Sequence, residues 1–396
     1  MARTPTVRGG TRANWLGKDQ PRLEDPHTVP VIMNIVAPDA RETVDLMGEA
    51  ASGAVLDTAF AWLCERRIDY ADSADVWNVR RRWPELKPRL QRDLLHGQYR
   101  FSPLRRIQID GECIELWAAL DALVLKALAM VLNRRLNFPR SCYHVPGRDG
   151  EAKRGAKAAV RHICSRLPSN QFVFRSDVKS YYASIDHAVL LGLVRDRIDD
   201  PLVLDLIAQY LHRTVDENCL YSTVTVGISL GCPLSPVMAA LYLEPLDRRM
   251  EATGLTYARF MDDWVILALT RWALRRAVVI VNETLRELRV EQHPDKTFIG
   301  WIERGFTFLG YWITEKGVTG VAPSTWDAFQ ERVARLYEQN APLEDIRRSV
   351  ELYVRRWKRW VLSGVREVSA SFGGRPDCEA LRMTPSCHDC YHAQHC

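Results

Sequence analysis

The sequence lacks a long hydrophobic run free of charge. Its longest apolar stretch, residues 116–132, is interrupted by Asp121 and Lys126 and is shorter than the about 20 apolar residues that cross a bilayer. The amino terminus has no apolar core segment, so no secretory signal peptide is expected. We therefore expect a cytoplasmic protein without a membrane partner, in which the ten cysteines stay reduced.

The sequence also lacks an internal repeat and a strong net charge. Its 396 residues carry a formal charge of only +5, and 47% of them are hydrophobic, so the chain can form two or three packed subdomains. Lys and Arg are nevertheless clustered, at residues 80–82, 134–135, 148–161 and 355–359. Such clusters suit a polyanion such as nucleic acid, whereas any single cluster is equally consistent with a solvated face.

Two apolar, strand-prone runs within residues 257–268 flank the adjacent acids Asp262 and Asp263. This pattern predicts a hairpin with the acids at its turn, because neighbouring side chains inside a strand point to opposite faces. Adjacent carboxylates in apolar surroundings repel each other, and a divalent cation shared with a third acid relieves that repulsion. An isolated Asp-Asp pair can also be a solvated turn or a helix cap.

A third acid, Asp177, ends a short strand that is predicted to be buried, and an aromatic turn follows it. Asp186 is expected to cap the next helix, because apolar residues then recur at helical spacing. Glycines and prolines make residues 227–236 irregular, and Ser235-Pro236 suits the N-cap and first turn of a helix that runs to about Met250.

The motifs Asp177-x-x-x-Tyr-Tyr-x-x-Ile, Gly231-x-Pro-x-Ser-Pro and Phe-Met-Asp-Asp, in this order, resemble the palm of a reverse transcriptase. The resemblance is strongest to the bacterial group II intron-like lineage and covers roughly residues 95–360. It implies an α+β right-hand polymerase with fingers, an antiparallel palm sheet flanked by helices, and an α-helical thumb. The expected divisions are a flexible basic segment (1–40), a helical N-terminal extension (41–100), fingers (101–170), palm (171–315), a helical thumb (316–370) and a Cys/His-rich tail (371–396).

The same resemblance implies that two Mg²⁺ ions are held by Asp177 and Asp262, with Asp263 completing the acidic site. Lys296 would protonate the departing pyrophosphate or contact a phosphate, unless it is a plain surface lysine. The Val178 carbonyl would add an oxygen ligand.

Three further residues would contact the nucleotide or the template. Tyr182 matches the ring that excludes a 2′-hydroxyl, although a core tyrosine is the competing interpretation. Gly231 would let the backbone approach the nascent base pair. Arg148 would contact the nucleotide or template phosphates, or lie on a solvated helix.

The sequence departs from the family in the fingers. Residues 108–117 are acidic and apolar where relatives carry a Lys- or Arg-rich hairpin, so we expect that hairpin to be missing. The triphosphate would then be neutralised by Arg105, Arg106 or Lys126. In addition, Leu230 replaces a common Gln, and Phe260-Met261 replaces a common Tyr-Ala.

The tail contains a Cys-x-x-Cys pair, one half of a zinc knuckle, but no second such pair. These cysteines therefore either form a Zn²⁺ site or are free thiols. The candidate ligands are Cys378, Cys387, Cys390 and Cys396.

The predicted function is RNA-directed DNA synthesis at a 3′ end from deoxynucleoside triphosphates, on a dedicated non-coding RNA template. A role in antiphage defence, with a protein partner or a second copy of the chain, is consistent with these departures. One alternative is template-independent or protein-primed DNA synthesis on the same fold. A second alternative is an RNA-binding, maturase-like protein without polymerase activity.

Overall fold

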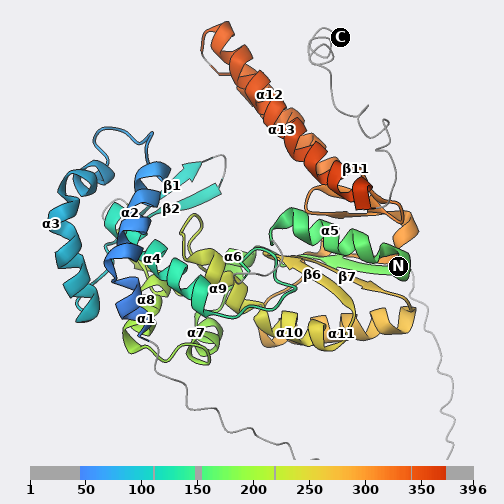
Figure 1. Ribbon diagram of the computed structural model, residues 1–396, viewed down its shortest axis with the longest axis horizontal. Coiled ribbons are helices and arrows are strands. Elements are labelled where there is room, and N and C mark those ends of the chain that lie inside the picture. Colours follow the sequence, from blue (N-terminus) through green and yellow to red (C-terminus); the bar gives the residue numbers. More distant parts are fainter. Residues whose placement is uncertain (1–44, 110–111, 148–153, 218–219, 340, 372–396) are drawn as a thin grey trace, which may run out of the picture. The chain divides into compact units, whose positions relative to one another are not determined.

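The computed structural model describes residues 45–109, 112–147, 154–217, 220–339 and 341–371 (Figure 1). The predicted helical character of residues 41–100 is confirmed, and Leu56, Leu63 and Leu90 lie in the core. These amino-terminal helices are α1 (Leu46–Ala50), α2 (Gly53–Arg66) and α3 (Asp75–Leu95), and they pack against α4 (Ala119–Arg135).

A β-hairpin precedes α4, so the prediction that the fingers hairpin is missing was wrong. Strand β1 (Leu104–Ile109) pairs antiparallel with β2 (Glu112–Leu116), and Arg105 lies opposite Leu116. The sequence between them is Asp-Gly, which is a strong hairpin signal whatever the charge of the strands. The hairpin extends into a sheet of order β2-β1-β4-β5, with β4 (Thr214–Glu217) and β5 (Leu220–Thr223).

The central sheet is antiparallel, with the order β6-β7-β3-β8. Its strands are β3 (Phe172–Ser176), β6 (Thr256–Phe260), β7 (Asp263–Ala268) and β8 (Phe298–Trp301). Helix α5 (Ala156–Arg166) covers one face, and α10 (Glu244–Ala252) and α11 (Arg271–Glu287) cover the other (Figure 1). This arrangement is the antiparallel sheet flanked by helices that the sequence predicted.

Alternate residues of the central strands enter two different apolar clusters. Phe174 and Ile266 pack in one cluster, whereas Val173 and Leu267 pack in the other. This alternation follows from the two-residue period of a strand. Because both faces are covered, β7 is a continuous buried run from Trp264 to Ala268.

Between β3 and β6 the chain is mainly helical, through α6 (Tyr181–Ser184), α7 (His187–Arg195), α8 (Pro201–Leu211) and α9 (Ser235–Tyr242). Asp186 caps α7 as predicted, because its carboxylate accepts hydrogen bonds from the first-turn amides. The single helix expected from Ser235 to Met250 is instead two helices, α9 and α10. Pro245 has no N–H to continue the hydrogen bonding of α9, and it sits in the first turn of α10, a position that proline tolerates.

The carboxyl-terminal part contains the strands β9 (Phe306–Phe308), β10 (Tyr311–Thr314) and β11 (Gly317–Val321), then the helices α12 (Pro323–Tyr337) and α13 (Leu343–Ser371). The helices predicted for residues 316–370 are present from Pro323 onwards, with Phe329 and Trp357 buried, whereas β11 is a strand within the range expected to be helical. Leu352 on α13 is 45% exposed.

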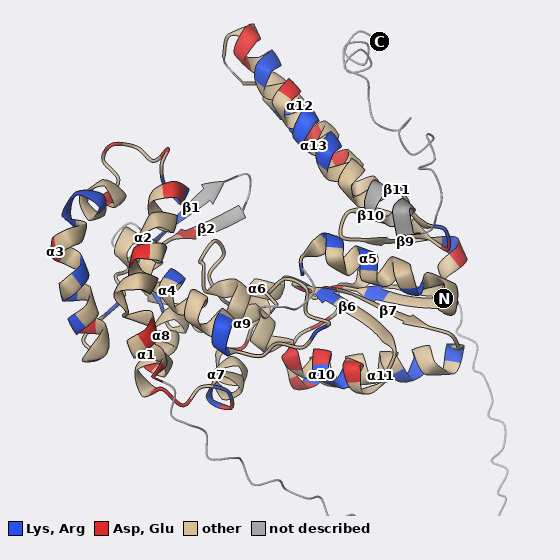
Figure 2. Ribbon diagram, in the orientation of Figure 1, with Lys and Arg blue, Asp and Glu red and all other residues tan. Residues whose placement is uncertain are grey.

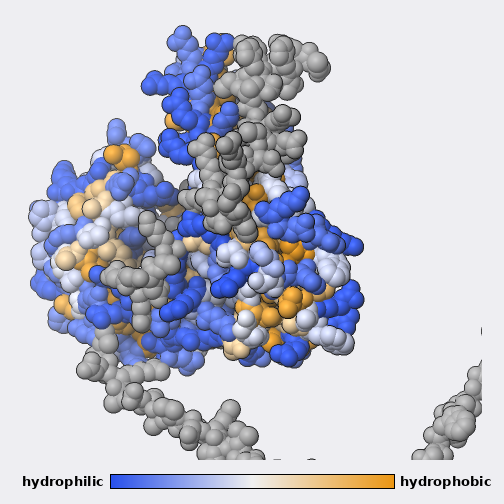
Figure 3. Space-filling view, turned by 45° about the vertical axis from the view of Figure 1, so that its right-hand side comes forward, coloured by the Kyte–Doolittle hydropathy of each residue, from blue (hydrophilic) through white to orange (hydrophobic). Residues whose placement is uncertain are grey.

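Hydrophilic side chains cover most of the face in Figure 3, and apolar patches lie among them. The exposed apolar side chains of the described residues include Trp272, Ile299 and Trp301. Within the described part of the chain, no helix has the length and apolarity needed to cross a membrane.

Candidate active site

The acids Asp262 and Asp263 lie at the turn of the β6–β7 hairpin, which confirms the predicted hairpin. Phe260 pairs with Asp263, so only Met261 and Asp262 connect the strands. Met261 has a φ of 58°, in the left-handed region that a non-glycine residue rarely adopts. Asp262 is therefore a turn residue, and Asp263 is the first residue of β7.

Asp177 lies beside this turn because β3 pairs antiparallel with β7. Ser176 is opposite Trp264, so the next step in the same register places Asp177 opposite Asp263. The Asp177 carbonyl accepts a hydrogen bond of 2.9 Å from the His293 N–H, which fixes the backbone there. Two stretches about eighty residues apart in sequence thus bring three acids to one end of the sheet.

The carboxyl groups perturb one another. Burial raises the pKa of Asp263 to about 7, Arg175 opposes this rise, and the negative charge of Asp177 adds to it. Burial also raises the pKa of Asp262, its own backbone amide opposes this, and Asp177 again raises it. Buried like charges at short range favour protonation, so the cluster has the electrostatics of an acidic site that needs a cation.

Two basic side chains lie against the acids. Lys296 Nζ is 2.7 Å from Asp177 Oδ2, and Arg175 Nε is 3.6 Å from Asp263 Oδ1. The sequence had suggested a phosphate or pyrophosphate role for Lys296, and here its ammonium group pairs with a predicted metal ligand. The sequence reasoning missed Arg175, although it stands two residues before Asp177, and strand residues two apart share a face.

One observation indicates that the three aspartates suit a divalent cation. Asp177 Oδ1 and Asp263 Oδ1 are buried, and neither accepts a hydrogen bond from any residue that the structure describes. Buried carboxylate oxygens are normally paired, and hard oxygen ligands are those that Mg²⁺ prefers. As the described side chains stand, no group of three or more His, Cys, Asp or Glu residues forms a metal-binding arrangement.

Tyr182 lies near these acids, at the start of the short helix α6. Burial raises the pKa of Tyr182 to about 12, and the charge of Asp262 contributes to the rise. The Tyr182 carbonyl accepts a 2.7 Å hydrogen bond from Ile228, and it would lie 2.9 Å from a Cβ added at Gly227. The loop that carries the glycine motif is therefore packed directly on the residue that carries the ring.

The remaining predicted residues differ in what surrounds them. Gly231 has a φ of +86°, and an added Cβ would touch only an Ile114 methyl group at 3.5 Å, so backbone conformation rather than space calls for glycine. Val178 is buried and forms a bridge with Gln292. Arg148 and the tail residues Cys378, Cys387, Cys390 and Cys396 lie outside the described residues.

Among the candidate triphosphate contacts, Arg106 pairs with Glu115 at 3.3 Å, and Lys126 lies 5.2 Å from the centre of the Trp62 ring. Arg105 is exposed. Figure 2 shows further Lys and Arg residues along α3, α12 and α13, which include the clusters at residues 80–82 and 355–359.

Residues 118–313 match the family described as reverse transcriptase (RNA-dependent DNA polymerase). The chain is 22% identical over 275 residues to protein YkfC of Escherichia coli K12, a match that covers 57% of this chain and 71% of YkfC. It is 26% identical over 161 residues to the group II intron-encoded protein LtrA of Lactococcus lactis subsp. cremoris, across 39% of this chain and 26% of LtrA.

A third relative, the putative COX1/OXI3 intron 2 protein of Saccharomyces cerevisiae, is 24% identical over 41% of this chain and 19% of that protein. The chain thus spans about a fifth to a quarter of the intron proteins that it matches. One chain of a solved partial Cas6-RT-Cas1–Cas2 complex aligns with this chain at 19% sequence identity and a TM-score of 0.36. The alignment covers 61% of this chain and 41% of the chain in the complex. The family match and the intron relatives identify residues 118–313 as a reverse transcriptase (RNA-dependent DNA polymerase) domain that is similar to the group II intron-encoded proteins.

Proposed function

We propose that the protein copies an RNA template into DNA, adding deoxynucleotides to a 3′ end at the cluster of Asp177, Asp262 and Asp263. The observation that carries this proposal is the β3–β7 register, which sets Asp177 opposite Asp263 and leaves one buried oxygen of each without a hydrogen-bond donor. An RNA-binding protein that did no chemistry would gain nothing from buried, mutually repelling carboxylates.

These three aspartates would hold Mg²⁺, which supplies activation of the 3′-hydroxyl and neutralisation of phosphate charge in nucleotidyl transfer. Asp177 and Asp262 are proposed to serve both ions, and the Val178 carbonyl would add an oxygen. Arg175 favours the ionised form of Asp263, because its positive charge lowers a carboxyl pKa that burial raises. The chain would thereby keep the acid available at neutral pH.

Lys296 is proposed to hold the acidic site together before the reactants arrive. Its ammonium group offsets the charge of Asp177 at 2.7 Å, and its side chain is half exposed, so it is able to turn towards a phosphate. In that second position it would either donate a hydrogen bond to the departing pyrophosphate or transfer a proton to it. Both roles use the same cation against negative oxygens.

Tyr182 is proposed to select the sugar. Its ring is near Asp262, and its backbone is bonded to the loop that leads to Gly231. A 2′-hydroxyl would meet this ring, whereas a deoxyribose would pass. Gly231 would let the loop backbone lie against the nascent pair, Arg148 would contact the nucleotide or template phosphates, and the exposed Arg105 is the best placed of the three basic candidates to meet the triphosphate.

The template is proposed to be a dedicated non-coding RNA, and the role to be antiphage defence. Leu230 supports a template different from that of intron enzymes, because its side chain has no amide group to form the hydrogen bonds of the Gln in relatives. It is 38% exposed in the loop before Gly231. Protein-primed or template-independent synthesis is the second candidate. Omitting RNA from the reaction separates RNA-directed from template-independent synthesis, since only the RNA-directed enzyme would lose incorporation.

The test of the acidic site is Asp262→Ala. We expect loss of Mg²⁺-dependent deoxynucleotide incorporation. Circular dichroism and RNA affinity should be unchanged, because Asp262 lies in a turn and is not part of a strand. The matched control is Asp69→Ala, an exposed acid in the loop after α2. Retained incorporation by Asp262→Ala would remove this residue from the mechanism.

For the tail, the Cys387-x-x-Cys390 spacing supports a Zn²⁺ site completed by Cys378 and Cys396. Elemental analysis of the purified protein should then give one equivalent of zinc. A protein without zinc would leave these cysteines as thiols.

A further inference from the structure

Met261 stands between strand β6 and the acids in a conformation that its own side chain does not favour. Its φ of 58° belongs to the left-handed region, where a Cβ crowds the neighbouring carbonyl. Most turns use glycine, asparagine or aspartate at such a position. The conformation therefore depends on contacts that other parts of the chain supply.

One such contact comes from His144, in the segment that precedes α5. The Met261 N–H donates a hydrogen bond of 3.1 Å to His144 Nδ1, and His144 Nε2 lies 3.2 Å from the Pro236 carbonyl oxygen. A backbone N–H only donates and a carbonyl only accepts, so the proton of the imidazole is on Nε2. Burial lowers the pKa of His144 to about 3, which keeps Nδ1 available as an acceptor at neutral pH.

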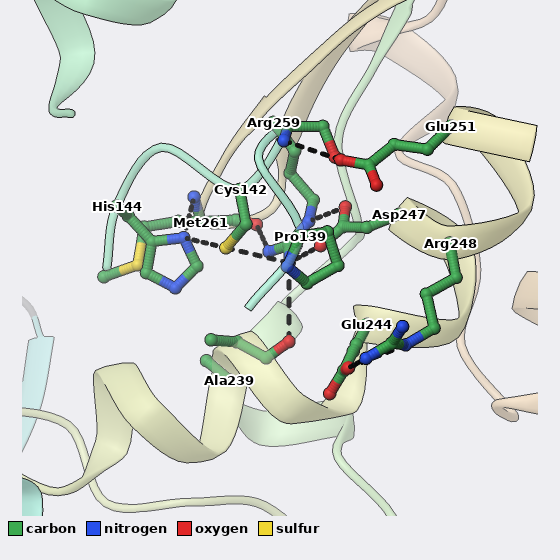
Figure 4. Close-up of polar contacts among 12 residues, drawn as sticks. Pro139, Cys142, His144, Ala239, Glu244, Asp247, Arg248, Glu251, Arg259 and Met261 are labelled. Atoms are coloured by element: carbon green, nitrogen blue, oxygen red, sulfur yellow. Dashed lines mark hydrogen bonds and ion pairs between the residues drawn. The ribbon is translucent and has the colours of Figure 1, made fainter. Parts of the chain in front are cut away.

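The other contact comes from Arg259, on strand β6. Arg259 Nη1 donates a hydrogen bond of 2.6 Å to the Met261 carbonyl. Its guanidinium is held in turn by Asp247, because Nε lies 2.7 Å from Asp247 Oδ1 and neither side chain is exposed. Figure 4 shows Arg259 reaching towards Asp247 on α10 and the His144 ring beside Met261.

The two contacts belong to one continuous structure. The Arg259 N–H donates to the Ser141 carbonyl at 2.9 Å, and the Tyr143 N–H donates to the Arg259 carbonyl at 2.8 Å. Residues 141–143 thus bond along the edge of β6 and bring His144 to the turn. Cys142 lies between them, accepting from Arg259 Nη2 at 3.3 Å with its sulfur 3.6 Å from His144 Nδ1.

We propose that His144 and Arg259 are positioning residues that hold the two ends of Met261 and so aim the Asp262 carboxylate at the metal position. This inference rests on the proposed function of the acidic site. Neither side chain touches a reacting group, and each acts through the backbone of Met261. Removing either contact frees the turn to relax towards a right-handed conformation, which redirects the carboxylate of the next residue.

The variants His144→Asn and His144→Leu form a matched pair. Their side chains have the same branching and nearly the same size, but only asparagine offers an acceptor close to the place of Nδ1. A loss of packing alone would affect both variants alike. A loss of the hydrogen bond would affect His144→Leu and spare His144→Asn.

The first measurement is Mn²⁺ affinity, followed by electron paramagnetic resonance of the unbound ion with no nucleotide present. We expect His144→Leu to bind Mn²⁺ about 10-fold or more weakly than wild type, the size of effect seen when a residue that orients a metal ligand is removed, and His144→Asn to remain near wild type. Equal affinity in all three proteins, or equal losses in both variants, would overturn the proposal.

The second measurement is hydrogen–deuterium exchange of a peptide that spans residues 258–264. Its amides should exchange faster in His144→Leu than in His144→Asn, with the rest of the protein unchanged. If the wild-type protein binds no Mn²⁺, the metal site of the proposed function is refuted. Hydrogen–deuterium exchange alone then tests whether His144 holds the backbone of Met261. Identical exchange in the two variants would show that His144 does not hold the turn.

Discussion

The Arg259–Asp247 pair gives the sharpest prediction about stability. Both side chains are completely buried, and burial lowers the pKa of Arg259 while the Asp247 carboxylate raises it well above its usual value. Asp247→Asn keeps the shape of the side chain but leaves the guanidinium charge uncompensated in the interior. Breaking a buried pair in this way costs about 3–5 kcal/mol of the free energy of unfolding.

Urea denaturation followed by circular dichroism measures this loss. With an m value of about 3 kcal/mol per molar urea, the midpoint should fall by roughly 1–2 M. The matched control is Glu287→Gln, which breaks the pair between Glu287 and Arg249 on the surface, where the two side chains are 55% and 42% exposed. There we expect no resolvable change, because water and salt already screen such charges.

A third protein tests the cause. Replacing both partners, as Arg259→Met with Asp247→Leu, removes the uncompensated charge, and its midpoint should lie above that of Asp247→Asn. If Asp247→Asn and Glu287→Gln shift the midpoint equally, burial of the pair does not carry the stability that we assign to it.

Two further predictions concern the sugar and the pH. Tyr182→Val should admit ribonucleotides, reducing discrimination between deoxy- and ribonucleotides by about 10-fold or more in single-nucleotide incorporation, and unchanged discrimination would place the selecting group elsewhere. Burial lowers the pKa of His144 from 6.5 to about 3. Between these two pH values His144 is therefore protonated in the unfolded chain and neutral in the folded protein. Stability from this group is present above pH 6.5 and falls as the pH drops towards 3; the urea midpoint should therefore decrease between pH 7 and pH 5, and less steeply in His144→Phe.

Much of the site was predictable because its signals are local. The apolar, strand-prone runs on either side of Asp262 and Asp263 predict a hairpin from local sequence alone, and Asp186 caps its helix through amides two and three residues away. The position of Asp177 beside that hairpin came from the order of three motifs. Its physical basis, the antiparallel β3–β7 register, is a long-range pairing that local periodicity does not encode.

The features that the sequence did not predict are long-range or were hidden by composition. The acidic and apolar composition of residues 108–117 hides the β1–β2 hairpin, which its Asp-Gly connection signals. The pairing of Lys296 with Asp177 joins residues 119 positions apart, and it depends on how the turn after α11 packs against the end of β3. His144 looks like any histidine in a loop until residues 141–143 are seen bonded along β6.

The turn at Leu309 and Gly310 joins the acidic site to the carboxyl-terminal helices. The backbone of Leu309 contributes to lowering the pKa of Asp263, while a Cβ added at Gly310 would lie 2.9 Å from the Trp360 ring on α13. Tyr311, the next residue, stacks on the same indole with 4.8 Å between the ring centres. A displacement of α13 would therefore reach Asp263 through the Trp360 ring and the two residues of this turn, which couples the position of a long helix to the charge of a buried carboxyl group.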